Sequence, residues 1–241
     1  MCTGRVDIAF IFRSFRNGVD GVYIAGCRLD ECKYITQGNY HALNIVLLSK
    51  KIMETIGLNP ERLRIEFMSS AEGSRFVETV NDFVRKVSAI GPFGESEGID
   101  GNGLKFKLDE IGKLIPYIKI ATRDKLSSRL KDPEEWSKLF TKDEIDTLFR
   151  ELPSYYIDPE KCQACMTCAR RCPVEAIISA KNRVHVIEQE KCIKCGTCFE
   201  VCPTKFSAVT KIIGEPVPPP LPEEKRTIIR KKKEKGETDK E

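Results

Sequence analysis

In the N-terminal part of the chain, segments with the apolar pattern of a strand alternate with segments that have the apolar spacing of a helix. Residues 21–26 form a short apolar run bounded by glycines, which is typical of a buried strand in a parallel sheet. Apolar and charged residues alternate over 63–67, the period of a strand with one buried face. Apolar residues recur at helical spacing over 43–56 and again over 76–87, and a short helix is expected around 7–17. This order predicts a helix followed by a βαβα unit, an α/β domain with a small parallel sheet.

The pattern changes after residue 92, where the chain becomes rich in glycine and loses its periodicity, so the first domain is expected to end there. Residues 93–153 predict a linker and helical connector, because an apolar helical stripe is followed by two capped helix starts at Asp132 and Thr141. Near the C-terminus, prolines and then lysines replace the apolar residues, and such a segment cannot offset the entropy lost on ordering. Residues 214–241 are therefore predicted to form a disordered tail.

Charge and hydropathy exclude several classes of protein for this chain of 241 residues. Its 40 basic and 36 acidic side chains nearly balance, so a net charge of +4 does not indicate a groove for nucleic acid. The sequence has no apolar stretch of the roughly 20 residues that membrane insertion requires. Its start also lacks the basic and then apolar order of a secretory signal. We therefore expect a cytoplasmic protein with no membrane insertion and no nucleic-acid partner.

Most of the 11 cysteines lie in one duplicated segment towards the C-terminus. Each copy has the C-x2-C-x2-C-x3-C-P spacing of ferredoxins that bind two [4Fe–4S] clusters. Three closely spaced thiolates wrap one cluster, while the fourth cysteine of each copy reaches the cluster of the other copy. The predicted ligands are Cys162, Cys165, Cys168 and Cys202 for the first cluster, and Cys192, Cys195, Cys198 and Cys172 for the second.

The duplicated motif predicts an α+β ferredoxin-like domain over residues 154–213. Cysteines are expected to fill every protein coordination site of the cluster irons. The domain is therefore expected to transfer electrons and not to catalyse a reaction. The alternative is a pair of zinc sites or a disulfide knot, but zinc does not require the x3-C-P ending or its duplication. Pro173 and Pro203 have a local role, because each turns the chain out of its loop and lets the preceding cysteine face the neighbouring cluster.

The remaining cysteines are Cys2, Cys27 and Cys32. Cys27 directly follows the first predicted strand, and loops at strand C-termini form the binding crevice of an α/β sheet. Together with the sequences Gly38-Asn-Tyr-His and Ala71-Glu-Gly-Ser, these cysteines resemble the delta (iron–sulfur) subunit of methyl-viologen-reducing [NiFe] hydrogenase.

The resemblance covers residues 1–92 and implies an electron adaptor that carries a [2Fe–2S] cluster. It implies a hetero-oligomer, in which the adaptor passes electrons between a hydrogenase or formate dehydrogenase and a flavoprotein of heterodisulfide-reductase type. Cys2, Cys27 and Cys32 are then three candidate ligands. The fourth is expected from a partner chain or from upstream residues, because the family's pattern begins with a further cysteine-bearing segment. The alternative is three free or buried thiols in a domain that only docks.

Two other functions fit the same residues. One is a free-standing ferredoxin-like carrier with a docking domain. The other is a disulfide reductase that uses Cys27 and Cys32 as a dithiol, although their C-x4-C spacing is looser than the C-x-x-C of thioredoxin-like sites. His41 and His185 are too isolated to form a catalytic pair, and both are expected to be structural. The preferred prediction is an electron-transfer subunit that is not catalytic by itself.

Overall fold

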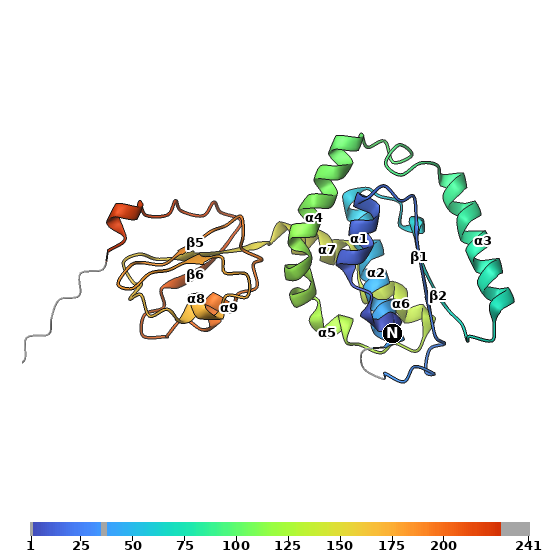
Figure 1. The fold of residues 1–241 in the computed structure, drawn as a ribbon, viewed down its shortest axis with the longest axis horizontal. Coiled ribbons are helices and arrows are strands. Elements are labelled where there is room, and N and C mark those ends of the chain that lie inside the picture. Colours follow the sequence, from blue (N-terminus) through green and yellow to red (C-terminus); the bar gives the residue numbers. More distant parts are fainter. Residues whose placement is uncertain (1, 35–37, 228–241) are drawn as a thin grey trace, which may run out of the picture. The chain divides into compact units, whose positions relative to one another are not determined.

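The computed structural model describes residues 2–34 and 38–227, and the chain divides into two compact units, Met1–Arg150 and Glu151–Glu241. The first unit contains η1 (Thr3–Arg5), α1 (Ile8–Arg16), β1 (Val22–Gly26), α2 (Asn39–Ile56), η2 (Pro60–Arg62), β2 (Leu63–Phe67), α3 (Gly73–Ile90), α4 (Gly101–Ala121), α5 (Arg123–Leu126), α6 (Pro133–Leu139) and α7 (Lys142–Arg150) (Figure 1). The second contains β3 (Pro153–Ile157), α8 (Thr167–Arg171), β4 (Ile177–Ile178), β5 (Val186–Ile187), α9 (Thr197–Glu200), β6 (Val209–Ile213) and η3 (Glu223–Lys225). Across the described ranges, every helix is too short or too polar to span a bilayer.

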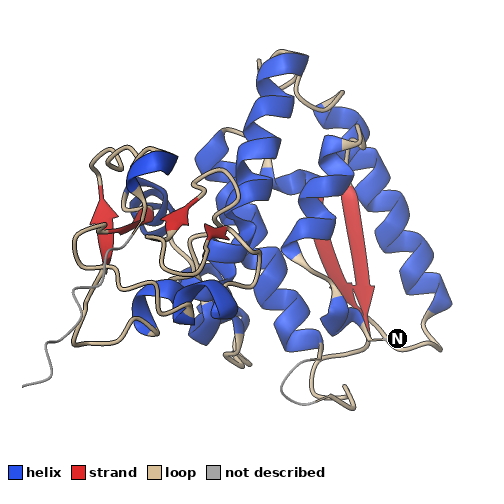
Figure 2. Cartoon of the chain, turned by 60° about the vertical axis from the view of Figure 1, so that its left-hand side comes forward, coloured by secondary structure: helices blue, strands red, loops and turns tan. Residues whose placement is uncertain are grey.

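The N-terminal elements follow the predicted order of one helix and a βαβα unit. β1 and β2 pair in parallel with Ile24 opposite Ile65, as Figure 2 shows for the two strands of the first unit. The helix α1 begins where the Asp7 carboxylate accepts a hydrogen bond from the Ala9 N–H at 2.9 Å. The helix α2 ends at Gly57, whose φ of 83° is the left-handed conformation common after a helix. The small parallel sheet of the predicted α/β domain is therefore confirmed.

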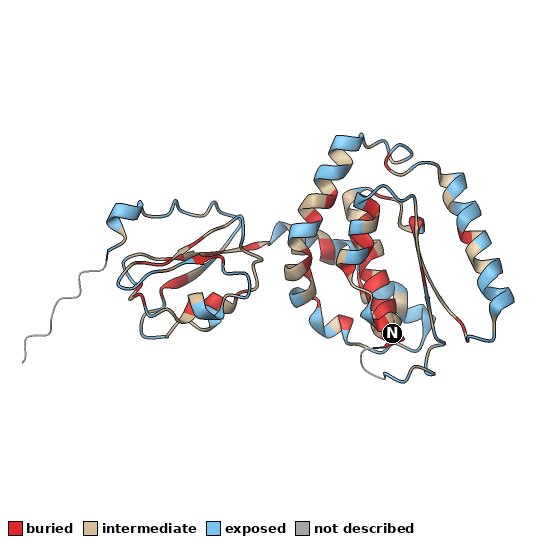
Figure 3. Ribbon diagram, in the orientation of Figure 1, coloured by how far each residue is buried: buried red, intermediate tan, exposed pale blue. Residues whose placement is uncertain are grey.

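The helix α2 forms the centre of the first unit, and Figure 3 shows buried residues along much of its length. Its residues Ile45, Leu48 and Ile52 are fully buried. They belong to a core that also includes Phe12 of α1 and Ile115 of α4. The segment predicted as a separate connector thus supplies helices to the same core. Its first helix begins at Gly101, within the glycine-rich stretch, because Asp100 caps it by accepting a hydrogen bond from the Gly103 N–H.

The predicted helix over 76–87 is present as α3, but its apolar stripe is only partly covered. Phe83 is buried and packs against Tyr23 of β1 with the ring centroids 5.5 Å apart. Phe76 and Val84 are 45% and 54% exposed. A sheet of two strands is too narrow to cover the whole apolar face of a long amphipathic helix. The helical periodicity therefore predicted that α3 forms, but it did not predict how much of α3 is buried.

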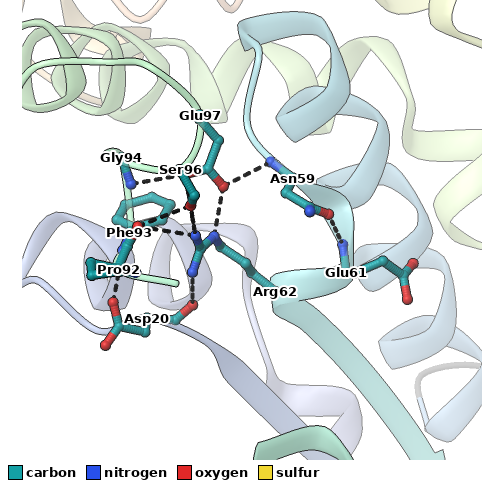
Figure 4. A network of polar contacts seen from close by, with 9 residues as sticks. All are labelled: Asp20, Asn59, Glu61, Arg62, Pro92, Phe93, Gly94, Ser96 and Glu97. Atoms are coloured by element: carbon teal, nitrogen blue, oxygen red, sulfur yellow. Dashed lines mark hydrogen bonds and ion pairs between the residues drawn. The ribbon is translucent and has the colours of Figure 1, made fainter. Parts of the chain in front are cut away.

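A buried ion pair lies where the chain enters β2 (Figure 4). The side chains of Arg62 and Glu97 are 0% and 6% exposed, and Arg62 Nε lies 2.6 Å from a Glu97 carboxylate oxygen. The guanidinium also donates hydrogen bonds to the backbone carbonyl oxygens of Asp20, at 3.0 Å, and Pro92, at 3.1 Å. One side chain therefore ties together the chain before β1, the start of β2 and the loop after α3.

The stability of the first unit is expected to decrease on acidification through Glu97. Burial raises the pKa of Glu97, but hydrogen bonds from Arg62 and the backbone N–H groups of Gly94 and Asn59 bring it below its ordinary value of 4.5. A carboxyl group with a lowered pKa stabilises the fold above its unfolded-state pKa, and that stabilisation is lost as pH falls through the folded-state pKa. Urea unfolding, followed by fluorescence of the single tryptophan Trp136, should show a falling free energy of unfolding below about pH 4.5.

Glu97→Gln provides the control for this pH dependence. The variant is expected to be less stable at neutral pH, because Arg62 loses its charged partner in a buried setting. Its free energy of unfolding should then change less steeply than that of the wild type in the acid range. An equally steep decrease in both proteins would assign the pH dependence to other carboxyl groups.

The second unit is built from two antiparallel strand pairs around a small core. β3 pairs with β6, and β4 pairs with β5. The core contains Ile157, Ile177, Ile187 and Val209 together with several cysteines. The strands thus enclose the cysteine motifs in apolar surroundings.

The segment that follows β6 differs from the sequence-based prediction of a disordered tail. The N–H of Val184 donates to the carbonyl oxygen of Arg226 at 2.8 Å, and Arg183 forms an ion pair with Glu223 at 3.1 Å. Prolines in this segment restrict the backbone before folding, so ordering it costs less entropy than composition alone suggests. Residues 214–227 therefore lie against the second unit. The rest of the predicted tail, residues 228–241, lies outside the described residues.

Candidate metal centres

The two cysteine motifs fold into matching loops. Ala164 and Met166 have φ angles of 49° and 65°, and Lys194 and Gly196, at the equivalent positions of the second motif, have φ angles of 57° and 81°. Left-handed residues between successive cysteines bend the chain sharply. The repeated sequence therefore produces a repeated backbone path, in which three closely spaced cysteines can face one centre.

The motif cysteines have neighbours in both motifs, in two local sets that each include a cysteine from the other motif. Burial, followed by the neighbouring Cys162 and Cys165, raises the pKa of the Cys168 thiol to about 11, and Cys202 of the second motif contributes to the same rise. The other set lines a single cavity of about 20 Å³ and consists of Cys172, Cys192, Cys195 and Cys198. These neighbours agree with the ligand sets that the spacing predicts, and the assignment of the cysteines to clusters stays a prediction.

The surroundings of these cysteines suit an iron–sulfur cluster in each set. Burial, with neighbouring Cys192 next in importance, raises the pKa of the Cys198 thiol to about 12. A buried thiol resists ionisation unless a cation such as cluster iron balances the thiolate charge. The N–H of Ala176 donates to Cys172 Sγ at 3.3 Å, the kind of hydrogen bond that stabilises ligand thiolates. The donors are therefore soft thiols that are buried or half-buried except for the exposed Cys165, and one of them accepts a backbone hydrogen bond.

The three N-terminal cysteines also meet, at the C-terminal end of β1. Cys2 Sγ and Cys32 Sγ are 3.7 Å apart. Burial and then the neighbouring Cys32 and Cys2 raise the pKa of Cys27. The pKa of Cys32 is lowered although burial opposes this, because the backbone N–H groups of Tyr34 and Asn39 donate to its sulfur. Within residues 2–34 and 38–227, no three His, Cys, Asp or Glu side chains are arranged to hold a single metal ion.

Asn39 supports this N-terminal cysteine group, although the sequence-based predictions did not include it. The side chain is 1% exposed, and its amide donates to the carbonyl oxygens of Cys27, at 3.0 Å, and Arg28, at 2.6 Å. Its place in the Gly38-Asn-Tyr-His sequence was the available signal. His41, in the same sequence, places Nδ1 3.1 Å from the Leu126 carbonyl oxygen, which supports the structural role expected for it.

Gly38→Ala is expected to disturb the N-terminal cysteine group. A Cβ atom at Gly38 would collide with the carbonyl oxygen of Tyr34 and with Cys32 Sγ, so Cys32 has to move. Mass spectrometry should then show faster alkylation of Cys32 by iodoacetamide. Gly73→Ala is the matched control, because a Cβ there meets open space. Equal alkylation rates in both variants would mean that Gly38 does not position Cys32.

His185 corrects a prediction, because its isolation along the chain indicated only a simple structural role. Its Nδ1 atom lies 3.4 Å from Cys168 Sγ, and the side chain is 1% exposed. The internal repeat contained the signal, since His185 precedes the second motif by the same number of residues as Tyr155 precedes the first. Aligning the two copies pairs His185 with Tyr155, and the structure places both side chains beside motif cysteines.

Known families match both parts of the chain. A model described as the delta subunit of methyl-viologen-reducing hydrogenase matches residues 1–91, and a 4Fe-4S dicluster domain model matches residues 156–209. The iron–sulfur subunit of the F420-non-reducing hydrogenase of Methanopyrus kandleri is 40% identical over 91 residues, which are 38% of this chain and 68% of that protein. The chain belongs to this delta-subunit family.

Other relatives of the delta-subunit domain occur in different protein contexts. The iron–sulfur subunit of the F420-non-reducing hydrogenase of Archaeoglobus profundus is 41% identical over 92 residues, which are 38% of this chain and 66% of that protein. The ferredoxin/F420H2-dependent CoB-CoM heterodisulfide reductase of Methanosarcina acetivorans has one subunit that is 46% identical over 94 residues, or 39% of this chain. The match spans only 12% of that subunit's length. The resemblance predicted from the N-terminal cysteines is confirmed, and here the delta-subunit domain is joined to a dicluster domain.

Proposed function

We propose that this chain is an iron–sulfur electron-transfer subunit whose second unit relays electrons through two [4Fe–4S] clusters. The proposal is supported by two observations: Cys202 lies near Cys168 of the first motif, and Cys172 lines one cavity with Cys192, Cys195 and Cys198 of the second. The two sets are neighbours, since Cys168 of the first set contributes to the raised pKa of Cys198 in the second. When bound, each cluster accepts and releases one electron at a time. The chain's own residues hold the two centres close together and away from water.

We further propose that Cys2, Cys27 and Cys32 bind a [2Fe–2S] cluster. The short distance between Cys2 and Cys32, and the influence of both on the pKa of Cys27, support a shared site. Four thiolates commonly hold such a cluster, so we propose that a partner chain supplies the fourth ligand. Cys27 is exposed at the end of β1, where a partner can reach it.

The partners that we propose are those of the family. Relatives of the first unit are named as subunits of F420-non-reducing hydrogenase and of CoB-CoM heterodisulfide reductase. We propose a hetero-oligomer in which this chain passes electrons between a hydrogenase or formate dehydrogenase and a flavoprotein of heterodisulfide-reductase type. Co-purification in a fixed ratio with such subunits would support this arrangement. A monomer that exchanges freely among acceptors would favour a free-standing carrier.

Iron and acid-labile sulfide analysis of anaerobically prepared protein tests the cluster assignment. About eight irons per chain are expected from the second unit alone, and about ten if the N-terminal site is filled. EPR of the reduced protein should add a separate [2Fe–2S] signal in the second case. Cys27→Ser should remove that signal and about two irons. If it instead abolishes turnover of a small disulfide with the iron content unchanged at about eight, Cys27 and Cys32 act as a redox dithiol.

A further inference from the structure

The His185 side chain is buried, and only one of its two ring nitrogens has a hydrogen-bond partner among the described residues. Its Nδ1 atom faces Cys168 Sγ at 3.4 Å, whereas Nε2 is buried without a hydrogen-bond partner among the described residues. A thiolate bound to iron can only accept a hydrogen bond, so Nδ1 has to carry the proton opposite Cys168. Neutral imidazole then leaves Nε2 as a bare acceptor.

The His185 side chain also lines a small cavity. A cavity of about 40 Å³ lies beside the ring and is lined by the strands that carry Ile157 and Ile187 and by Val217 and Leu221 of the proline-rich segment. This volume holds about one water molecule, which would donate to Nε2. Because the segment after β6 covers this cavity, bulk solvent does not compete for the hydrogen bond between His185 and Cys168.

The equivalent position of the other copy carries a different side chain. Tyr155 occupies it and lines the cavity of the second cysteine set, with its hydroxyl group against Gly196. Its ring packs near Phe199, with the centroids 6.3 Å apart. The pseudo-symmetric fold thus presents an imidazole N–H to the first set and a phenol to the second. Two centres with equivalent ligands therefore have different neighbours.

We propose that His185 donates a hydrogen bond to the Cys168 thiolate and thereby makes the first cluster easier to reduce than it would be without this donor. This inference rests on the proposed function, since it requires both [4Fe–4S] clusters. Reduction adds negative charge to the cluster and its thiolates, so a donor aimed at one ligand stabilises the reduced form. His185 is a positioning residue, because it acts through Cys168.

His185→Phe tests the proposal, because it keeps an aromatic ring and removes the donor. EPR-monitored redox titration of the full chain should show one [4Fe–4S] potential moving to a more negative value and the other unchanged. At the wild-type midpoint, the ratio of reduced to oxidised first cluster should fall about fivefold, the effect of one ordinary hydrogen bond. His185→Asn, which places an amide N–H near the position of Nδ1, should restore part of the shift. Tyr155→Phe is the matched control and should leave the first potential unchanged.

A second measurement covers the case in which His185→Phe fails to assemble its clusters. In wild-type protein with 15N-labelled histidine, pulsed EPR of the reduced first cluster should detect coupling to an imidazole nitrogen. Absence of that coupling overturns the proposal, and so does an unchanged pair of potentials in His185→Phe with about eight irons retained. Iron far below eight in the wild type would instead contradict the proposed function itself.

Discussion

Cys202→Ala is expected to empty the cluster site of the first motif, although Cys202 belongs to the second. Cys202 lies with Cys162, Cys165 and Cys168, and its removal leaves three thiolates for four cluster positions. Iron should fall from about eight to about four per chain. Differential alkylation then shows which cluster is lost, because thiols of an emptied set react with iodoacetamide and thiols bound to iron do not.

The matched control for Cys202→Ala is its mirror image, Cys172→Ala. Here the cysteines that become reactive should be those that share a cavity with Cys172, namely Cys192, Cys195 and Cys198. The two variants should thus give opposite labelling patterns at similar iron content. If each variant instead exposes the cysteines of its own motif, the exchange of ligands between the motifs is wrong. Each motif of the second unit would then have to hold a cluster without a ligand from the other motif.

Arg62→Met is expected to destabilise the first unit more than other single changes to its charged residues. Methionine keeps much of the side-chain volume but leaves the Glu97 carboxylate buried without its cation. Breaking a buried pair by removing one partner typically costs about 3–5 kcal/mol. The carbonyl oxygens of Asp20 and Pro92 also lose a donor. Urea unfolding of the full chain, followed by Trp136 fluorescence, should show the midpoint at a much lower urea concentration.

Arg85→Met is the control for Arg62→Met on an exposed ion pair. The Arg85 side chain is 78% exposed and lies 4.0 Å from an Asp82 oxygen. Exposed pairs contribute about 0–1 kcal/mol, so this variant should unfold close to the wild type. A similar midpoint for both variants would show that the buried network in Figure 4 does not hold the first unit together.

Much of the fold could be predicted because its elements are local. Gly57 ended α2 as expected, and the alternation over 63–67 became β2. The periodicity did not predict which neighbouring element packs against each apolar helix face. The apolar stripe of α3 is only partly covered, whereas helices after Gly101 join the core of α2. Periodicity reports which face of an element is apolar, but the number and position of neighbouring elements decide whether that face is covered.

The sequence by itself predicted the two sets of cluster cysteines, because the spacing of a ferredoxin motif also indicates how its loop bends and where its fourth ligand goes. It also determined the family of the first domain. Only the tertiary structure placed His185 against Cys168, Cys2 against Cys32 and Arg62 against Glu97. The members of each of these pairs are far apart along the chain. Their contacts depend on how whole elements pack, which no local spacing encodes.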